Sequence, residues 1–136
     1  MKKTLSRKNP DYISKERYYE LKHFCLQYPE WRQELRRLDG YLRGGVLVAQ
    51  TDGQTRQPTE EIAMMRATVS ERIEIVETAL RRCSDIPMMQ RAVLMGATQG
   101  VPYEVIRARN PDFWETRDVY YEVYRHFFYC LSEERR

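Results

Sequence analysis

The side chains best suited to chemistry lie near the end of the chain, where hydrogen-bond donors recur at the spacing of one helix face. They flank the turn signal Asn110-Pro111. Arginine reads guanine or clamps phosphate, threonine and tyrosine hydroxyls donate to phosphate, and arginines beside a turn anchor a nucleic-acid backbone. The residues that we single out as candidate DNA contacts are Arg107, Arg109, Thr116, Arg117, Tyr121 and Arg125.

The same pattern has a purely structural interpretation. Tyrosines at 120, 121 and 124 can pack in a core, while Arg117 and Arg125 form ion pairs with nearby acids. Nothing in the residue spacing separates this interpretation from DNA contact, so both stay open.

The elements that must position these residues are helical. We expect a helix from Met88 to Gln99, a left-handed cap at Gly100 and a short helix from Pro102 to Ala108. A long helix then continues to about Glu133, capped by an Asp112/Glu115 box or by Thr116. Its expected buried face comprises Tyr120, Val123, Tyr124, Phe127 and Leu131. This order of elements is what a helix-turn-helix needs, with the last helix entering the major groove.

Helical periodicity also dominates the rest of the chain. Ser14 can cap a helix that runs to about Gln27, and Pro29 fits the first turn of a second helix that ends at Gly44. The stretch 44–57 is irregular, with a brief apolar run over 46–48 followed by polar residues, which is typical of a mobile linker. A long helix is expected from Pro58 to Cys83.

One apolar stripe follows this long helix, with steps of three and four residues. It can pack on the chain's own short helices, on a second copy or on another partner helix. The residues that we assign to this dimer or partner seam are Ile62, Met65, Val69, Ile73, Val76 and Leu80.

We therefore predict an all-α fold with an N-terminal helical hairpin, one long central helix and a C-terminal helix-turn-helix-like bundle. The expected divisions are a basic arm over 1–13, the hairpin and linker over 14–57, and the long helix with the helix-turn-helix-like domain over 58–136.

Charge is distributed unevenly along the chain. The formal net charge is only +3, but residues 1–57 carry 12 basic and 7 acidic side chains, whereas residues 86–136 carry seven of each. Phosphate attraction supplies most nonspecific DNA affinity, so a neutral C-terminal part favours help from dimerisation or from the basic arm. The arm residues expected to contact DNA are Lys2, Lys3, Arg7 and Lys8.

Other functional classes lack their signatures. The sequence contains no phosphate-binding glycine loop, no H-E-x-x-H and no G-x-S-x-G, so we expect no enzyme and no cofactor. Cys25, Cys83 and Cys130 are widely spaced in apolar stripes, which favours reduced core residues over a metal site. The absence of a long apolar run predicts a cytoplasmic protein without membrane contact.

The chain resembles small phage and prophage transcription regulators of the ArpU/RinA-like group, whose C-terminal part is similar to the DNA-reading region 4 of sigma factors. The matching stretches are Tyr18–Trp31, Pro58–Glu77 with its S-E-R-I-E-I-V-E core, and Gly100–Leu131. This resemblance implies an all-helical protein that acts on a promoter, with the last helix as recognition element. Asp118 and Glu122 depart from the more basic helix that the family leads us to expect.

The partners expected from these observations are double-stranded DNA, a second copy of the chain, and host RNA polymerase or another host protein. A rival hypothesis is a non-enzymatic phage interaction protein, such as an inhibitor of a host machine or a packaging adaptor. The neutral C-terminal part, the seam of the long helix and an aromatic stripe with Tyr121 and Tyr129 suit a protein interface equally well.

Overall fold

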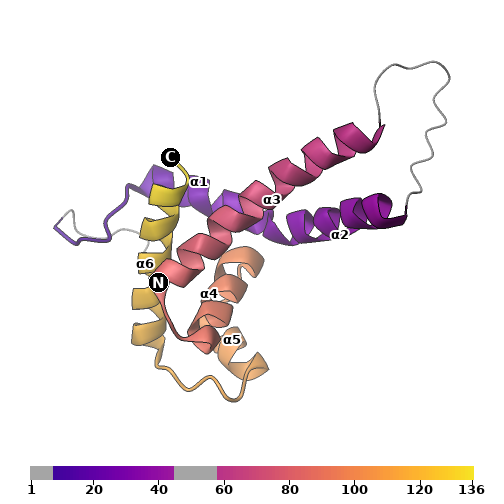
Figure 1. Cartoon of the computed structure of the whole chain (residues 1–136). Coiled ribbons are helices and arrows are strands. Elements are labelled where there is room, and N and C mark those ends of the chain that lie inside the picture. The colour runs from indigo at the N-terminus through magenta and orange to yellow at the C-terminus, as the bar shows by residue number, and fades with distance from the viewer. Residues whose placement is uncertain (1–7, 45–57) are drawn as a thin grey trace. The chain divides into compact units, whose positions relative to one another are not determined.

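The computed structural model describes residues 8–44 and 58–136, and every regular element in these ranges is a helix (Figure 1). The predicted all-α fold class is thus confirmed. The predicted linker from 45 onward and the arm residues Lys2, Lys3 and Arg7 lie outside the described residues. The helices are α1 (Lys15–Leu26), α2 (Tyr28–Gly44), α3 (Pro58–Cys83), α4 (Pro87–Gln99), α5 (Tyr103–Arg109) and α6 (Arg117–Glu134).

Local capping signals set most of these boundaries. The Ser14 hydroxyl accepts a hydrogen bond from the Arg17 backbone N–H at 3.2 Å, and Gly100 ends α4 with a left-handed φ of 69°. For α6 the cap is Thr116, whose hydroxyl accepts from the Val119 N–H at 3.3 Å. The earlier capping box at Asp112 and Glu115 is therefore not the start of that helix.

The chain forms two compact units that differ from the predicted domains. Among the described residues, unit 1 comprises 8–27 and 75–136, and unit 2 comprises 28–44 and 58–74. These boundaries differ from the predicted division at 14–57 and 58–136, since α1 packs with α4 and α6 and α2 belongs with the first part of α3. The apolar stripe of a helix indicates that the helix packs on another element, but it does not indicate which element. The N-terminal hairpin was predicted because α1 and α2 are adjacent in sequence.

The core of unit 1 is aromatic. Helix α1 packs on α4 and α6, and α4 also packs on α5. Tyr18 of α1 meets the ring of Phe128 edge-on at a centroid distance of 5.0 Å, and Tyr124 lies 4.9 Å from the same ring. The predicted face of α6 is buried except for Val123, which is half-buried.

Arginine side chains fasten the C-terminal end of α6 within unit 1. Arg17 of α1 donates to the backbone carbonyls of Ser132 at 3.0 Å and Arg135 at 2.8 Å. Arg82 at the end of α3 pairs with Glu133 at 2.5 Å and with Glu134 at 2.8 Å. The carbonyls at the end of a helix lack partners within it, so the Arg17 bonds compensate for that loss.

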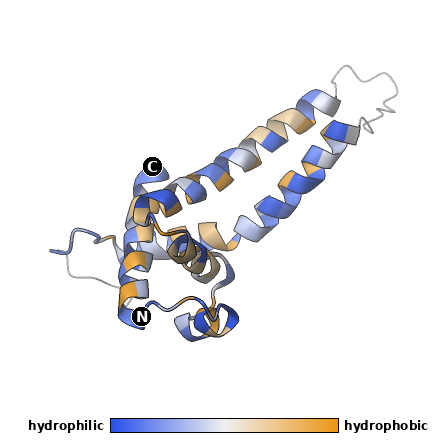
Figure 2. Ribbon diagram, turned by 60° about the horizontal axis from the view of Figure 1, so that its bottom comes forward, coloured by the Kyte–Doolittle hydropathy of each residue, from blue (hydrophilic) through white to orange (hydrophobic). Residues whose placement is uncertain are grey.

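Unit 2 consists of α2 and the N-terminal part of α3. Figure 2 shows that α2 is largely hydrophilic along its length. Arg66 of α3 pairs with Asp39 of α2, and the side chains of Leu38, Val69 and Ile73 are buried. The ion pair joins two helices that would be unstable alone in water.

The predicted seam of α3 is mostly covered by the chain itself. Val69, Ile73, Val76 and Leu80 are buried, Ile62 is half-buried, and Met65 is 47% exposed. A second copy can therefore reach only the N-terminal end of the seam in the folded chain, and not the continuous six-residue stripe.

Helices α4 and α6 approach each other closely at Gly96. A Cβ atom added there would lie only 2.1 Å from the Tyr120 hydroxyl oxygen, and 3.4 Å from the Ile106 side chain. Tyr120 is 1% exposed, and its hydroxyl has no hydrogen-bond partner among the described residues. Glycine is thus required at 96 by the space that the phenol occupies.

This packing predicts opposite effects for one substitution in two backgrounds. Gly96→Ala should destabilise the protein by about 1–3 kcal/mol, because the Tyr120 hydroxyl must move. In a Tyr120→Phe background the clash disappears, and Gly96→Ala should instead stabilise by up to about 1 kcal/mol through helix propensity. Chemical denaturation of the four proteins measures the coupling.

Gly40→Ala in α2 is the matched control, because an added Cβ there meets nothing within 4 Å. It should stabilise in both backgrounds. Equal effects of Gly96→Ala with and without the Tyr120 hydroxyl would contradict the proposed contact.

Candidate nucleic-acid interface

Helices α4, α5 and α6 follow one another with short turns, in the order that a helix-turn-helix requires. Gly100 closes α4 through its N–H, which donates to the Gly96 carbonyl at 3.1 Å, and α5 begins three residues later. The positive φ of Gly100 lets the chain reverse sharply at this point.

Tyr103 holds the start of α5 against the start of α6. Its backbone N–H donates to the Tyr121 hydroxyl at 3.2 Å, and its own hydroxyl donates to the Glu115 carbonyl at 2.5 Å. Its ring also contacts Phe113 and Tyr120, with centroid distances of 6.2 and 5.7 Å. These contacts fix the orientation of α6 relative to α5.

The turn between α5 and α6 is ordered by Asn110 and Phe113. The Asn110 amide donates to the Ile106 carbonyl at 2.8 Å, and the Phe113 N–H donates to the Asn110 carbonyl at 2.9 Å. Phe113 is 1% exposed, so it anchors the turn in the core.

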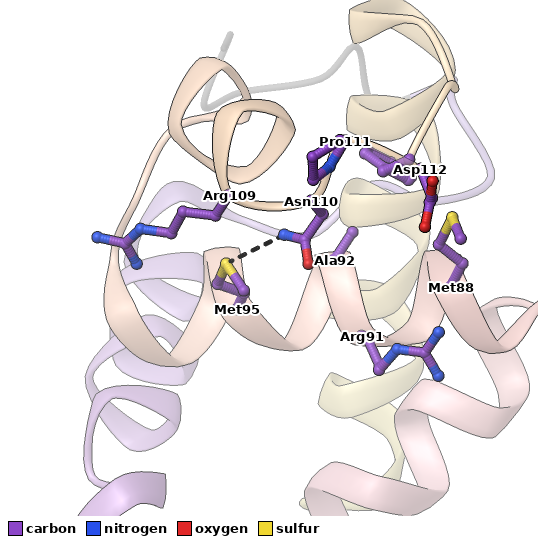
Figure 3. Close-up of a pocket in the computed structure, with 9 residues that line it drawn as sticks. Met88, Arg91, Ala92, Met95, Arg109, Asn110, Pro111 and Asp112 are labelled. Atoms are coloured by element: carbon purple, nitrogen blue, oxygen red, sulfur yellow. Dashed lines mark hydrogen bonds between the residues drawn. The ribbon is translucent and has the colours of Figure 1, made fainter.

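A hollow of about 210 Å³ lies between this turn and α4 (Figure 3). The picture shows the Asn110 amide pointing to the sulfur of Met95, at 3.9 Å, and Arg109 extending outward. Methionine and phenylalanine side chains contribute to its lining, with Arg91, Arg109 and Asp112 also present. This mixture offers no paired acid and base for catalysis.

The candidate DNA contacts fall into two groups. The side chains of Arg107, Arg109, Thr116 and Arg117 are exposed, as is Lys8 of the arm, whereas Tyr121 and Arg125 are half-buried. The exposed group surrounds the turn between α5 and α6. Their exposure leaves them accessible to a partner, and their contact with DNA stays a prediction.

Most of these residues also have structural roles. Arg107 donates to the Tyr103 hydroxyl at 3.4 Å, Arg109 donates to the Gln99 side chain at 3.3 Å, and Thr116 caps α6. Arg117 pairs with Glu104 of α5 at 3.3 Å, and its guanidinium lies 5.1 Å from the Tyr121 ring centre. The Tyr121 hydroxyl accepts the Tyr103 N–H described above. The ion pair predicted for Arg117 is thus present, and its contact with DNA stays a prediction.

The most exposed large apolar side chain at this turn escaped the sequence reasoning. Trp114 is 73% exposed, and Val119 on the first turns of α6 is 39% exposed. Trp114 follows the buried Phe113 directly, and periodicity cannot say which of two adjacent aromatics faces the core outside a helix. Acids at 115 and 118 lie close by in sequence, so this part of the face is not basic.

A second constellation that spacing did not reveal joins Asp11, His126 and Cys130. The His126 Nδ1 lies 2.8 Å from the Asp11 carboxylate, and its Nε2 lies 3.6 Å from the Cys130 sulfur. The order resembles a nucleophile, base and orienting acid. Cys130 is only 1% exposed, however, and burial raises the pKa of its thiol. A nucleophilic cysteine needs access and a lowered pKa, so this arrangement is not a reactive centre.

The other two cysteines are also buried. Cys25 and Cys83 are buried, and desolvation raises the pKa of both thiols, that of Cys83 to about 12. Within residues 8–44 and 58–136, no group of three histidine, cysteine or acidic side chains is placed to hold a metal ion. None of the helices described above is long and apolar enough to cross a membrane.

Comparisons with family models, with curated proteins and with solved structures found no match to this chain.

Proposed function

We propose that this chain is a phage-type transcription regulator that binds DNA through α5, the following turn and the N-terminal half of α6. The observation that carries the proposal is the group of exposed donors around that turn: Arg107, Arg109, Thr116 and Arg117. Such side chains contact phosphates and base edges when a helix enters the major groove. The expected resemblance to the ArpU/RinA-like regulators supports the same proposal.

Charge sets the strength of this binding. The C-terminal part is neutral, and Arg117 must leave Glu104 or share its guanidinium with DNA. We therefore infer modest affinity per chain, increased by the basic arm and by a second copy. Binding should fall steeply with added salt, because each phosphate contact releases counterions.

The Arg117–Glu104 pair predicts opposite effects of two substitutions on DNA affinity. Arg117→Ala should weaken binding to a prophage promoter fragment by about tenfold. Glu104→Gln should strengthen it, because the substitution removes a negative charge and releases the guanidinium. Fluorescence anisotropy at two salt concentrations measures both.

Arg72→Ala and Glu71→Gln are the matched controls, because they make the same charge changes at exposed positions of α3. They should leave the affinity almost unchanged. No binding by the wild type at low salt, or equal effects of the α3 and the α5–α6 substitutions, would refute the proposed interface.

A protein-interaction function is the second candidate, and the exposure of Trp114 favours it. An exposed tryptophan beside acidic residues suits a partner with an apolar and basic surface, and tryptophan is enriched at the centres of protein interfaces. The two functions are compatible only if the partner leaves the arginines free.

This candidate predicts that Trp114→Ala abolishes capture of a host protein from a nuclease-treated bacterial lysate. Ile86→Ala is the control, since Ile86 is 53% exposed at the start of α4. The control should retain the partner. If both variants retain the partner, or if both lose it, the partner does not bind at Trp114.

Dimerisation is also part of the proposal, with a smaller contact than the sequence indicated. Met64 and Met65 are 67% and 47% exposed and lie beside the half-buried Ile62 on α3. Replacing both methionines with glutamine should shift a dimer toward the monomer in light scattering. A wild type that stays monomeric at high micromolar concentration would contradict the dimer.

A further inference from the structure

Helix α2 of unit 2 carries two arginines that no other part of the described chain engages. Arg36 and Arg43 are both exposed, and neither forms an ion pair or a hydrogen bond with a described residue. They lie seven residues apart, which is about 10 Å along a helix axis and close to two full turns, so both side chains leave α2 on the same face. Trp31 and Leu38, which are buried, lie on a different face of the helix.

The acids that could neutralise this face are already engaged. Asp39 is the only acid three or four residues away from either arginine, and its carboxylate pairs with Arg66 of α3. Glu34, the next acid of α2, accepts two hydrogen bonds from Arg37, at 3.0 and 2.5 Å. Two positive charges of α2 are thus left without a counter-ion among the described residues.

The acids at the start of α3 form a separate surface of unit 2. Glu60 and Glu61 line an open hollow together with Met64 and Met65, and no residue of α2 contributes to its lining. These carboxylates therefore do not compensate the charge of the α2 face.

The space between the two arginines is open. Gly40 lies between them on the same face, and a Cβ atom added there would meet no atom within 4 Å. A glycine in the middle of a helix costs about 1 kcal/mol relative to alanine, and no close packing within the described chain requires one here. The face therefore consists of two cations that flank bare helix backbone, with no large apolar side chain between them.

A structural role accounts for only one of the two arginines. Arg43 lies in the last turn of α2, where a cation stabilises the negative end of the helix dipole. Arg36 lies in the middle of the helix, where that effect is absent.

The composition of the face suits a polyanion better than a protein. The centre of a protein interface is enriched in aromatic and apolar side chains, which this face lacks. Arginine donates short, charge-assisted hydrogen bonds to phosphate oxygens, and it needs no apolar neighbour to do so.

We propose that this face of α2, comprising Arg36, Gly40 and Arg43, contacts the phosphate backbone of double-stranded DNA. The proposal rests on the proposed function and extends it, because it adds a contact in unit 2 to the one made by α5 and α6. Each arginine donates to a phosphate oxygen, and Gly40 lets the DNA backbone come close to the helix. The contact carries no sequence information, and it supplies positive charge that the neutral C-terminal part lacks.

Fluorescence anisotropy of the full chain with a mixed-sequence duplex, titrated at several salt concentrations, tests this contact. The double variant Arg36→Gln with Arg43→Gln should bind about tenfold more weakly than the wild type. The slope of its log affinity against log salt should fall by about two, because two phosphate contacts are lost. Lysine at both positions keeps the two charges and should retain the slope.

Arg37→Gln is the matched control, since Arg37 is an exposed arginine of the same helix that pairs with Glu34. It should leave the affinity and the salt slope unchanged. Wild-type affinity and slope in the double glutamine variant, or an equal loss in Arg37→Gln, would overturn the proposal.

Arg117→Ala, titrated alongside, separates this result from the proposed function. If Arg117→Ala weakens binding and the double glutamine variant does not, the α2 contact fails and the α5–α6 interface stands. If only the double glutamine variant weakens binding, the α5–α6 interface fails and the α2 contact stands. No binding by the wild type at low salt overturns both.

Discussion

The position of α6 depends on the fit of one phenol against one glycine. The hydroxyl of Tyr120 occupies the space where any other residue at 96 would place its Cβ atom. The centroid of the Tyr120 ring also lies 5.7 Å from that of Tyr103 and 6.2 Å from that of Phe113. This one side chain of α6 therefore contacts α4, α5 and the turn between α5 and α6. A hydroxyl buried without a partner costs about 1–3 kcal/mol, which the burial of this large ring must offset.

This constraint decides which side chains remain for function. Once Tyr120 fixes α6, Tyr121 faces the start of α5 and Arg117 comes within reach of Glu104. Arg117 stays exposed, together with the arginines at the end of α5, the Thr116 cap and Trp114. For the DNA-binding surface that we propose, the small number of unpaired cations predicts weak intrinsic affinity and a need for additional contacts elsewhere.

Local signals in the sequence predicted the helices better than their assembly. Ser14 and Gly100 act through contacts within a few residues, so their capping roles were visible without a structure. The division into units was not, because the partner of α1 is set by packing between distant segments. The same holds for the candidate site. The arginines beside the turn could be singled out from the sequence, because they flank a local turn signal. The exposure of Trp114 and the contact of Asp11 with His126 could not, because they depend on tertiary structure.

The central claim is that α5 and the first half of α6 meet DNA. Backbone amide shifts of ¹⁵N-labelled protein, recorded while a short mixed-sequence duplex is added at low salt, test it most directly. The account predicts that the largest shifts cluster between residues 103 and 125. Shifts confined to α2 and to residues 58–74 of α3, or none at all, would contradict it.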